Sequence, residues 1–142
     1  MIPKCIKQKQ LEERVDSMIE TITNENGTAV KFSDGTMICR KKIDKENFLA
    51  TEEFYNTAQN IKIYRSNLFI WNFPAKFINS DITINVNIST GINNTRFNIP
   101  RTADLYSSSV TIQLLSIEQF TENGLAYKDL NNVHVIAIGR WK

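Results

Sequence analysis

Apolar residues near the start of the chain are spaced as in a helix. Between Lys7 and Asn24 they recur every three or four residues, and mostly polar side chains separate them. A stripe this narrow is typical of a coiled coil, whereas a helix that lies on a globular core usually has a wider apolar face. The stripe consists of Leu11, Val15, Met18 and Ile22.

One interpretation of this stripe is a coiled-coil stem over residues 11–26. A helix of two heptads is only marginally stable alone in water, so its apolar side chains need partners, and copies of the same chain would supply them. The alternative is an amphipathic helix that packs on its own domain. In both cases Gly27 suits the left-handed residue that ends a helix.

After Gly27 the period of the pattern changes to two, as expected for strands with one buried face. Residues 28–32 predict a strand, Ser33-Asp34-Gly35 a tight turn, and residues 36–43 the returning strand. An Asp-Gly pair supplies the positive φ angles that a two-residue hairpin turn requires. A β-hairpin is therefore predicted here.

Strand patterns continue along the rest of the sequence. Residues 81–89 and 132–141 alternate between apolar and polar side chains, whereas residues 44–60 are irregular and predict a long loop or a short helix. Short strands separated by turns are typical of an antiparallel sandwich or barrel. The chain is thus predicted to be mainly β, with an α-helical stem before an antiparallel β-sandwich head over residues 27–142. The other predicted strands cover residues 61–64, 67–73, 95–99 and 109–117.

Composition and charge fit one globular domain. The 142 residues are 42% hydrophobic with a net charge of +2, which argues against a disordered chain. The basic run Arg40-Lys41-Lys42 is interpreted as solvated surface, so no nucleic-acid partner is predicted. The sequence shows no signal peptide and no apolar run of the roughly 18 residues that a membrane span needs. We therefore expect synthesis in the cytoplasm and no membrane insertion.

Residues for catalysis or metal binding are sparse. His134 is the one histidine, which excludes a multi-histidine metal centre, and within a predicted strand it is interpreted as a structural residue. Cys5 and Cys39 lie in different predicted elements, and we expect both to stay reduced. No nucleophile with a neighbouring base and no glycine-rich phosphate loop is recognisable. The sequence therefore predicts no enzyme, no catalytic residue, no metal and no cofactor.

Side chains suited to ligand binding occur in predicted loops. A tyrosine ring stacks on a sugar or a protein surface while polar neighbours hydrogen-bond to it. The segment from Arg101 to Ser107 is predicted to be a loop of this kind. An ordinary exposed loop is the alternative interpretation for each residue. The candidate ligand-binding residues are Arg101, Asp104, Tyr106 and Tyr127.

Three segments together resemble a known family. The stretch V-K-F-S-D-G-T-M-I-C over residues 30–39 looks like the hairpin that opens the C-terminal head of many tail fibre and receptor-binding proteins of phages infecting Gram-positive bacteria. The stretch F-P-A-K-F-I over residues 73–78 resembles a strand entry in the middle of those heads. The final A-I-G-R-W-K, residues 137–142, is similar to their last residues. The order and spacing of the segments carry the resemblance, which covers residues 28–142.

The resemblance implies a trimeric head at the end of a fibre that recognises a host surface structure, often a cell-wall saccharide. Such heads commonly follow a trimeric coiled coil, so the partners expected are a homotrimer, a host saccharide and another virion protein bound through an anchor peptide, residues 1–10. We expect a position in the virion, at the tail or baseplate rather than the capsid. Residues 41–59 depart from the family's Gly/Ser/Tyr-rich middle, so no family binding site is transferred there. The alternative is a structural decoration or short fibre with no receptor.

Overall fold

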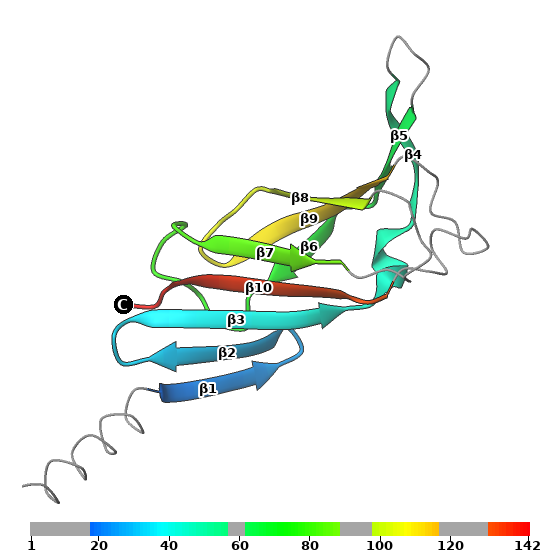
Figure 1. The fold of residues 1–142 in the computed structure, drawn as a ribbon. Helices are drawn as coiled ribbons and strands as arrows, with labels where there is room; N and C mark the ends of the chain where they lie inside the picture. The colour runs from blue at the N-terminus through cyan, green and yellow to red at the C-terminus, as the bar shows by residue number, and fades with distance from the viewer. Residues whose placement is uncertain (1–17, 57–61, 89–97, 117–130) are drawn as a thin grey trace, which may run out of the picture.

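The protein, described here as a computed structural model, is built from two antiparallel sheets (Figure 1). The structure describes residues 18–56, 62–88, 98–116 and 131–142, and within them it contains strands and one short 3-10 helix but no α-helix. The prediction of a mainly β chain with antiparallel sheets is confirmed. The first sheet has the order β1-β2-β3-β10-β7, and the second contains β4, β5, β6, β8 and β9.

The elements have the following bounds: β1 Met18–Asn24, β2 Gly27–Phe32, β3 Thr36–Ile43, η1 Lys45–Phe48, β4 Ala50–Asn56, β5 Lys62–Ser66, β6 Phe69–Asn72, β7 Thr83–Asn87, β8 Asn98–Ala103, β9 Ser109–Ser116 and β10 Val133–Arg140. Residues 44–60, predicted as a loop or short helix, thus contain the 3-10 helix η1 and the whole of strand β4. The segment predicted as a strand over residues 95–99 is described from residue 98, where β8 begins.

The predicted hairpin is present as β2 and β3, with Val30 opposite Ile38. Its turn differs from the expectation, because Gly35 has a positive φ of 96° and Asp34 does not. Three residues lie between the strands, and the Gly35 N–H donates to the carbonyl oxygen of Phe32 at 3.1 Å. A three-residue turn with glycine at the left-handed position replaces the two-residue turn that the sequence predicted.

The prediction of a helix as far as Asn24 is wrong over the described residues, because Met18–Asn24 is strand β1. This strand pairs antiparallel with β2, with Ile22 opposite Ala29. Ile22 packs against the core of its own chain and does not lie on a coiled-coil seam. The β-branched residues of the segment favour a strand, and pairing with β2 outweighs the helical spacing of two apolar positions. Leu11 and Val15 lie outside the described residues.

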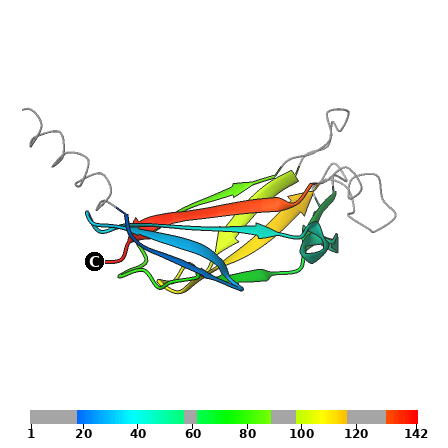
Figure 2. The ribbon, with the colours of Figure 1, turned by 90° about the horizontal axis from the view of Figure 1, so that it is seen from below.

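The two sheets form two layers around one hydrophobic core (Figure 2). Along β10 the apolar residues Val133, Val135 and Ala137 are fully buried, while the alternate residues face outward, as their spacing predicted. Each large apolar side chain so buried stabilises the fold by about 1.5–3 kcal/mol. The core also contains Ala29, Met37, Cys39, Ile43, Phe48, Trp71, Phe73, Phe77, Val110, Ile112 and Leu114.

The three segments that carry the family resemblance meet at one end of the molecule. The C-terminus lies beside the β2–β3 turn (Figure 1), where the Trp141 N–H donates to the carbonyl oxygen of Gly35 at 2.9 Å. The Ile78 N–H donates to the carbonyl oxygen of Arg140 at 2.8 Å, and Phe77 approaches Gly139 so closely that a Cβ there would lie 2.8 Å from the ring. The motif residues therefore hold the fold together at this end.

Candidate ligand-binding site

Two of the predicted ligand-binding residues, Arg101 and Asp104, line one hollow on the outside of the second sheet. We call it the polar hollow, and its volume is about 460 Å³. Two guanidinium groups and one carboxylate give it a positive balance of charge, and amide and hydroxyl groups complete it. Its lining residues are Arg65, Ser66, Asn67, Leu68, Arg101, Ala103, Asp104, Thr111 and Gln113.

The floor of the polar hollow is formed by paired strands β8 and β9. Arg101 lies opposite Gln113, and Ala103 lies opposite Thr111. Directly opposite residues share a face of a sheet, and this face points away from the core because the alternate residues of β9 are core residues. Gln113 and Thr111 are nevertheless only 6% and 7% exposed. Polar side chains that are buried on an outer face mark the deepest part of the hollow.

One wall of the polar hollow is formed by residues between β5 and β6. These two strands pair one after the other with the edge of β9 that β8 does not occupy. Strand β5 pairs with β9 up to Arg65, and β6 resumes the pairing at Phe69. The register shifts by one residue across this break, which is the geometry of a β-bulge. The side chain of Ser66 turns inward and its Oγ accepts a hydrogen bond from the Leu114 N–H at 2.9 Å.

The same bulge fixes Gln113. Its Nε2 donates to the carbonyl oxygen of Ser66 at 2.9 Å. An amide held by its nitrogen presents its oxygen in a set direction, and that oxygen is a hydrogen-bond acceptor. The bulge residue Leu68 is 64% exposed at the rim. The hollow therefore combines a fixed acceptor, two guanidinium donors and an apolar rim.

Asp104 enters the polar hollow from a strained backbone position. It is the one non-glycine residue among those described that has a positive φ, 47°. Aspartate tolerates this left-handed conformation better than most residues do. The position ends β8 and turns the chain into residues 104–108, where the Tyr106 N–H donates to the carbonyl oxygen of Ser109 at 2.8 Å. Backbone strain of this kind is often found at functional sites.

The remaining predictions for the site have mixed outcomes. Tyr106 is 61% exposed, as a binding residue would be, but it does not line the polar hollow. Arg101 was predicted in a loop and instead lies in strand β8. Tyr127 lies outside the described residues. Sequence reasoning missed Arg65 and Gln113, because nothing in the sequence links residues 48 positions apart that meet only through the pairing of β5 and β9.

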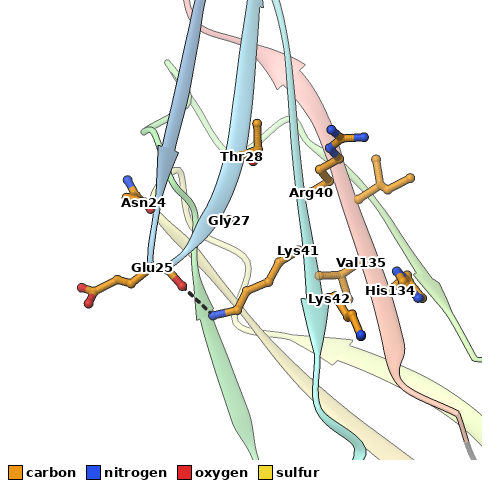
Figure 3. A pocket seen from close by; sticks show the side chains of 10 residues that line it. Asn24, Glu25, Gly27, Thr28, Arg40, Lys41, Lys42, His134 and Val135 are labelled. Carbon is orange, nitrogen blue, oxygen red and sulfur yellow. Dashed lines mark hydrogen bonds between the residues drawn. The ribbon is translucent and has the colours of Figure 1, made fainter.

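A second hollow, which we call the basic hollow, lies beside the β1–β2 hairpin (Figure 3). Its volume is about 600 Å³. The run Arg40-Lys41-Lys42, interpreted from the sequence as solvated surface, forms one side of it. His134, expected to be a structural residue, is instead exposed on the outer face of β10 and lines this hollow.

Two groups have shifted pKa values that bear on the chemistry of the molecule. Burial raises the pKa of the Cys39 thiol to about 12, against a smaller opposing effect of a hydrogen bond with the backbone of Ala75. The hydrogen bonds from Thr36, mainly its N–H, lower the pKa of Asp34 below its ordinary value. Cys39 therefore carries almost no nucleophilic thiolate near neutral pH, and Asp34 is occupied in shaping the β2–β3 turn.

Searches of the described part of the chain for two other kinds of feature gave no candidate. No group of three or more histidine, cysteine, aspartate or glutamate side chains within residues 18–56, 62–88, 98–116 and 131–142 is placed to hold a metal ion. No helix among those residues is long and apolar enough to cross a membrane.

Comparisons of the chain with protein-family models, with curated proteins and with solved structures gave no match. What the protein binds is therefore inferred from its own residues and from the motifs described above.

Proposed function

We propose that this protein is the non-enzymatic head of a trimeric phage virion fibre, and that it binds a saccharide of the host cell surface through the polar hollow. The observation that carries the proposal is the convergence of Arg65, Arg101, Asp104 and Gln113 on one hollow. Planar guanidinium, amide and carboxylate groups can each form two hydrogen bonds, and they can therefore bind two neighbouring hydroxyl groups of a sugar. The exposed Leu68 at the rim offers an apolar surface to the C–H face of the ring.

The charge of the polar hollow narrows the class of saccharide. Two guanidinium groups stand against one carboxylate, and arginine binds carboxylate and phosphate groups in a bidentate manner. No aromatic side chain is among the residues that line the hollow, so ring stacking contributes little there. The ligand that fits best is a sugar carrying an acidic group, held by hydrogen bonds and by charge.

Assembly and location complete the proposal. The fibre is a homotrimer, attached through residues 1–10 to another virion protein at the tail or baseplate. Met18 and Ile22 belong to strand β1. Of the predicted stripe, a coiled-coil stem would therefore contain Leu11 and Val15. What supports this part is the resemblance of the three motif segments, which also contact one another in the fold.

Binding to purified cell-wall saccharides tests the proposed site. We expect Arg101→Ala and Asp104→Asn each to weaken binding, because the first removes a charged donor for the acidic group of the sugar and the second removes a charged acceptor for its hydroxyl groups. Asparagine keeps the shape of Asp104 and tolerates its backbone conformation. The matched control is Lys76→Ala, an exposed cation outside the hollow. If both hollow variants bind as the unchanged protein does, the polar hollow is not the receptor site.

Light scattering tests the assembly, and labelled virions test the location. A mass near that of three chains is expected for the purified protein, and a monomer at micromolar concentration contradicts the trimer. An antibody label on the capsid, together with a failure to bind any host saccharide, favours a structural decoration instead.

A further inference from the structure

We propose that the basic hollow is a second binding site, which takes an anionic polysaccharide, and that it acts independently of the polar hollow. Its side chains belong to the first sheet, and the polar hollow belongs to the second. The inference goes beyond the proposed receptor site and does not need that site to be correct.

The shape of the basic hollow follows from a difference in strand length. Strand β2 begins at Gly27 and pairs with β3 only as far as Arg40, whereas β3 continues to Ile43 beside β10. The hairpin tip at Asn24 and Glu25 thus ends before β3 does, and a step remains between them (Figure 3). The step gives this face of the sheet its hollow.

The step is held open by contacts from the inner side. Lys41 Nζ donates to the backbone carbonyl oxygen of Glu25 at 3.0 Å (Figure 3). Trp71 Nε1 donates to the carbonyl oxygen of Asn26 at 2.8 Å, and Asn24 Nδ2 donates to the carbonyl oxygen of Pro74 at 3.0 Å. Three side-chain hydrogen bonds therefore fix a four-residue tip. The hollow is formed before any ligand binds, which lowers the entropic cost of binding.

Two of the positive charges of the basic hollow belong to Arg40 and Lys42. Arg40 and Lys42 point away from the core and are exposed, since they alternate with buried Cys39 and Ile43. Neither side chain forms an ion pair or a hydrogen bond with the residues that the structure describes. Two residues apart on one strand, they lie about 7 Å from each other. Unpaired cations at this spacing fit successive acidic groups of an extended polymer.

The neighbours of these cations favour a saccharide over a nucleic acid. Thr28 lies opposite Arg40 on β2, and His134 lies opposite Lys42 on β10. One strand further, Asn85 and Asn87 occupy the same two rows of the outer face. Hydroxyl, imidazole and amide groups hydrogen-bond to sugar hydroxyls.

Among the side chains that line the basic hollow there is no tryptophan, tyrosine or phenylalanine, and the imidazole of His134 is the one aromatic ring. Stacking on aromatic rings is what holds the bases of a single-stranded nucleic acid. Ile136, which lines the hollow and is 40% exposed, offers an apolar surface to the C–H groups of a sugar ring. The side chains present thus suit hydroxyl groups and acidic groups better than they suit bases.

Titration of the protein against polymers of known charge tests the inference. The probes are polygalacturonate, a poly(glycerol phosphate), neutral dextran and single-stranded oligothymidylate of similar length. We expect the two anionic polymers without bases to bind, dextran not to bind, and the nucleic acid to bind more weakly. Comparison of the first two probes tells whether carboxylate or phosphate is the better ligand.

The double variant Arg40→Ala/Lys42→Ala tests the residues. We expect it to weaken binding of the anionic polymers about tenfold or more, because hydrogen bonds to charged groups are the stronger ones. It should also lower the slope of log K against log salt by about two. The control Lys62→Ala/Lys76→Ala removes the same charge from exposed sites outside the hollow, and Arg101→Ala/Asp104→Asn tests the polar hollow separately.

Four outcomes overturn the inference. One is an equal loss of affinity in the Lys62/Lys76 control, which means that only net charge matters. The second is binding of oligothymidylate as tight as that of the anionic polysaccharides. The third is no binding of any anionic polymer by the unchanged protein. The fourth is loss of polymer binding in the Arg101/Asp104 variant but not in the Arg40/Lys42 variant, which means that the polymer binds at the polar hollow and leaves the receptor proposal in place.

Discussion

The indole Nε1 of Trp141 donates a hydrogen bond to the carbonyl oxygen of Phe32 at 2.9 Å, and these two residues are 109 positions apart in the sequence. The ammonium groups of Lys31 and Lys142 lie 5.3 and 4.9 Å from the centre of the indole ring. Arg140 Nη2 adds a hydrogen bond to the carbonyl oxygen of Asp34 at 2.8 Å. The last residues of the chain thus hold the β2–β3 turn in place by hydrogen bonds to its carbonyl groups.

Trp141→Phe should lower the free energy of unfolding by about 1 kcal/mol, because a smaller aromatic ring remains while the half-buried carbonyl of Phe32 loses one of its two donors and keeps the Gly35 N–H. Urea unfolding followed by circular dichroism measures the change. Tyr106→Phe removes a hydroxyl from an exposed ring and should stay within about 0.5 kcal/mol. An equal effect of the two changes would mean that the indole hydrogen bond adds no stability.

Gly27→Ala should destabilise the protein more than Gly35→Ala does. Both glycines have positive φ angles, 117° and 96°. A Cβ at Gly27 would overlap the backbone oxygen of Arg40 within strand β3. At Gly35 it would meet the far end of the Arg140 side chain, which can move, and the backbone oxygen of Lys142 at the end of the chain. We expect a loss of about 3 kcal/mol or more at Gly27 and about 1–2 kcal/mol at Gly35. The reverse order in thermal or urea unfolding would contradict the packing at the β1–β2 tip.

Ser66→Ala should destabilise the protein by about 1–3 kcal/mol, because the buried N–H of Leu114 loses its acceptor. We also expect it to weaken ligand binding at the polar hollow, since the bulge positions Gln113. Ser108→Ala, at an exposed serine, is the matched control and should change little. A stable Ser66→Ala variant with unchanged binding would show that the bulge keeps its shape without this hydroxyl.

Stability should fall at alkaline pH because of Cys39. Its pKa of about 12 in the folded state lies above the value of 9.0 for an exposed thiol, so the folded protein keeps a proton that the unfolded chain releases. The contribution of Cys39 is therefore complete below pH 9 and is lost as the pH rises from 9 towards 12. In a Cys5→Ser background, urea unfolding at several pH values measures this slope, and Cys39→Ala should flatten it.

The same background allows a check on reactivity. Iodoacetamide at neutral pH should leave Cys39 unmodified in the folded protein and alkylate it once urea unfolds the chain, because the thiolate is the reactive form. Rapid alkylation of the folded protein would mean that the core opens readily around β3.

Sequence patterns predicted the strands whose two faces differ most. Strand β10 alternates between core residues such as Val135 and outward residues such as Ile136, and its pattern alone located it correctly. The segment from Met18 to Asn24 was misassigned because apolar residues at positions 18 and 22 also fit a helix. The spacing of residues within one segment carries no information about distant strands. This segment forms a strand because it pairs with the free edge of β2.

The candidate site was predictable only in part, because its residues come from segments that are far apart in the sequence. Arg101 and Asp104 are close in sequence, and both belong to the segment that the sequence predicts to be an exposed loop. Arg65 joins them only because β5 and β8 both pair with β9. Arg40 and Lys42 were visible as a charge cluster, but the step that gives the cluster its shape depends on where β2 begins.

Opposite placement of the two hollows has a consequence for attachment strength. If both hollows bind polymer as proposed, a strand held at one outer face would leave the other face accessible, so a single molecule could join two strands of a meshwork. Once the first contact is made, the second occurs at an effective concentration in the millimolar range for short flexible connections. Weak individual contacts then add up to tight avidity, and copies gathered on one particle would multiply it further.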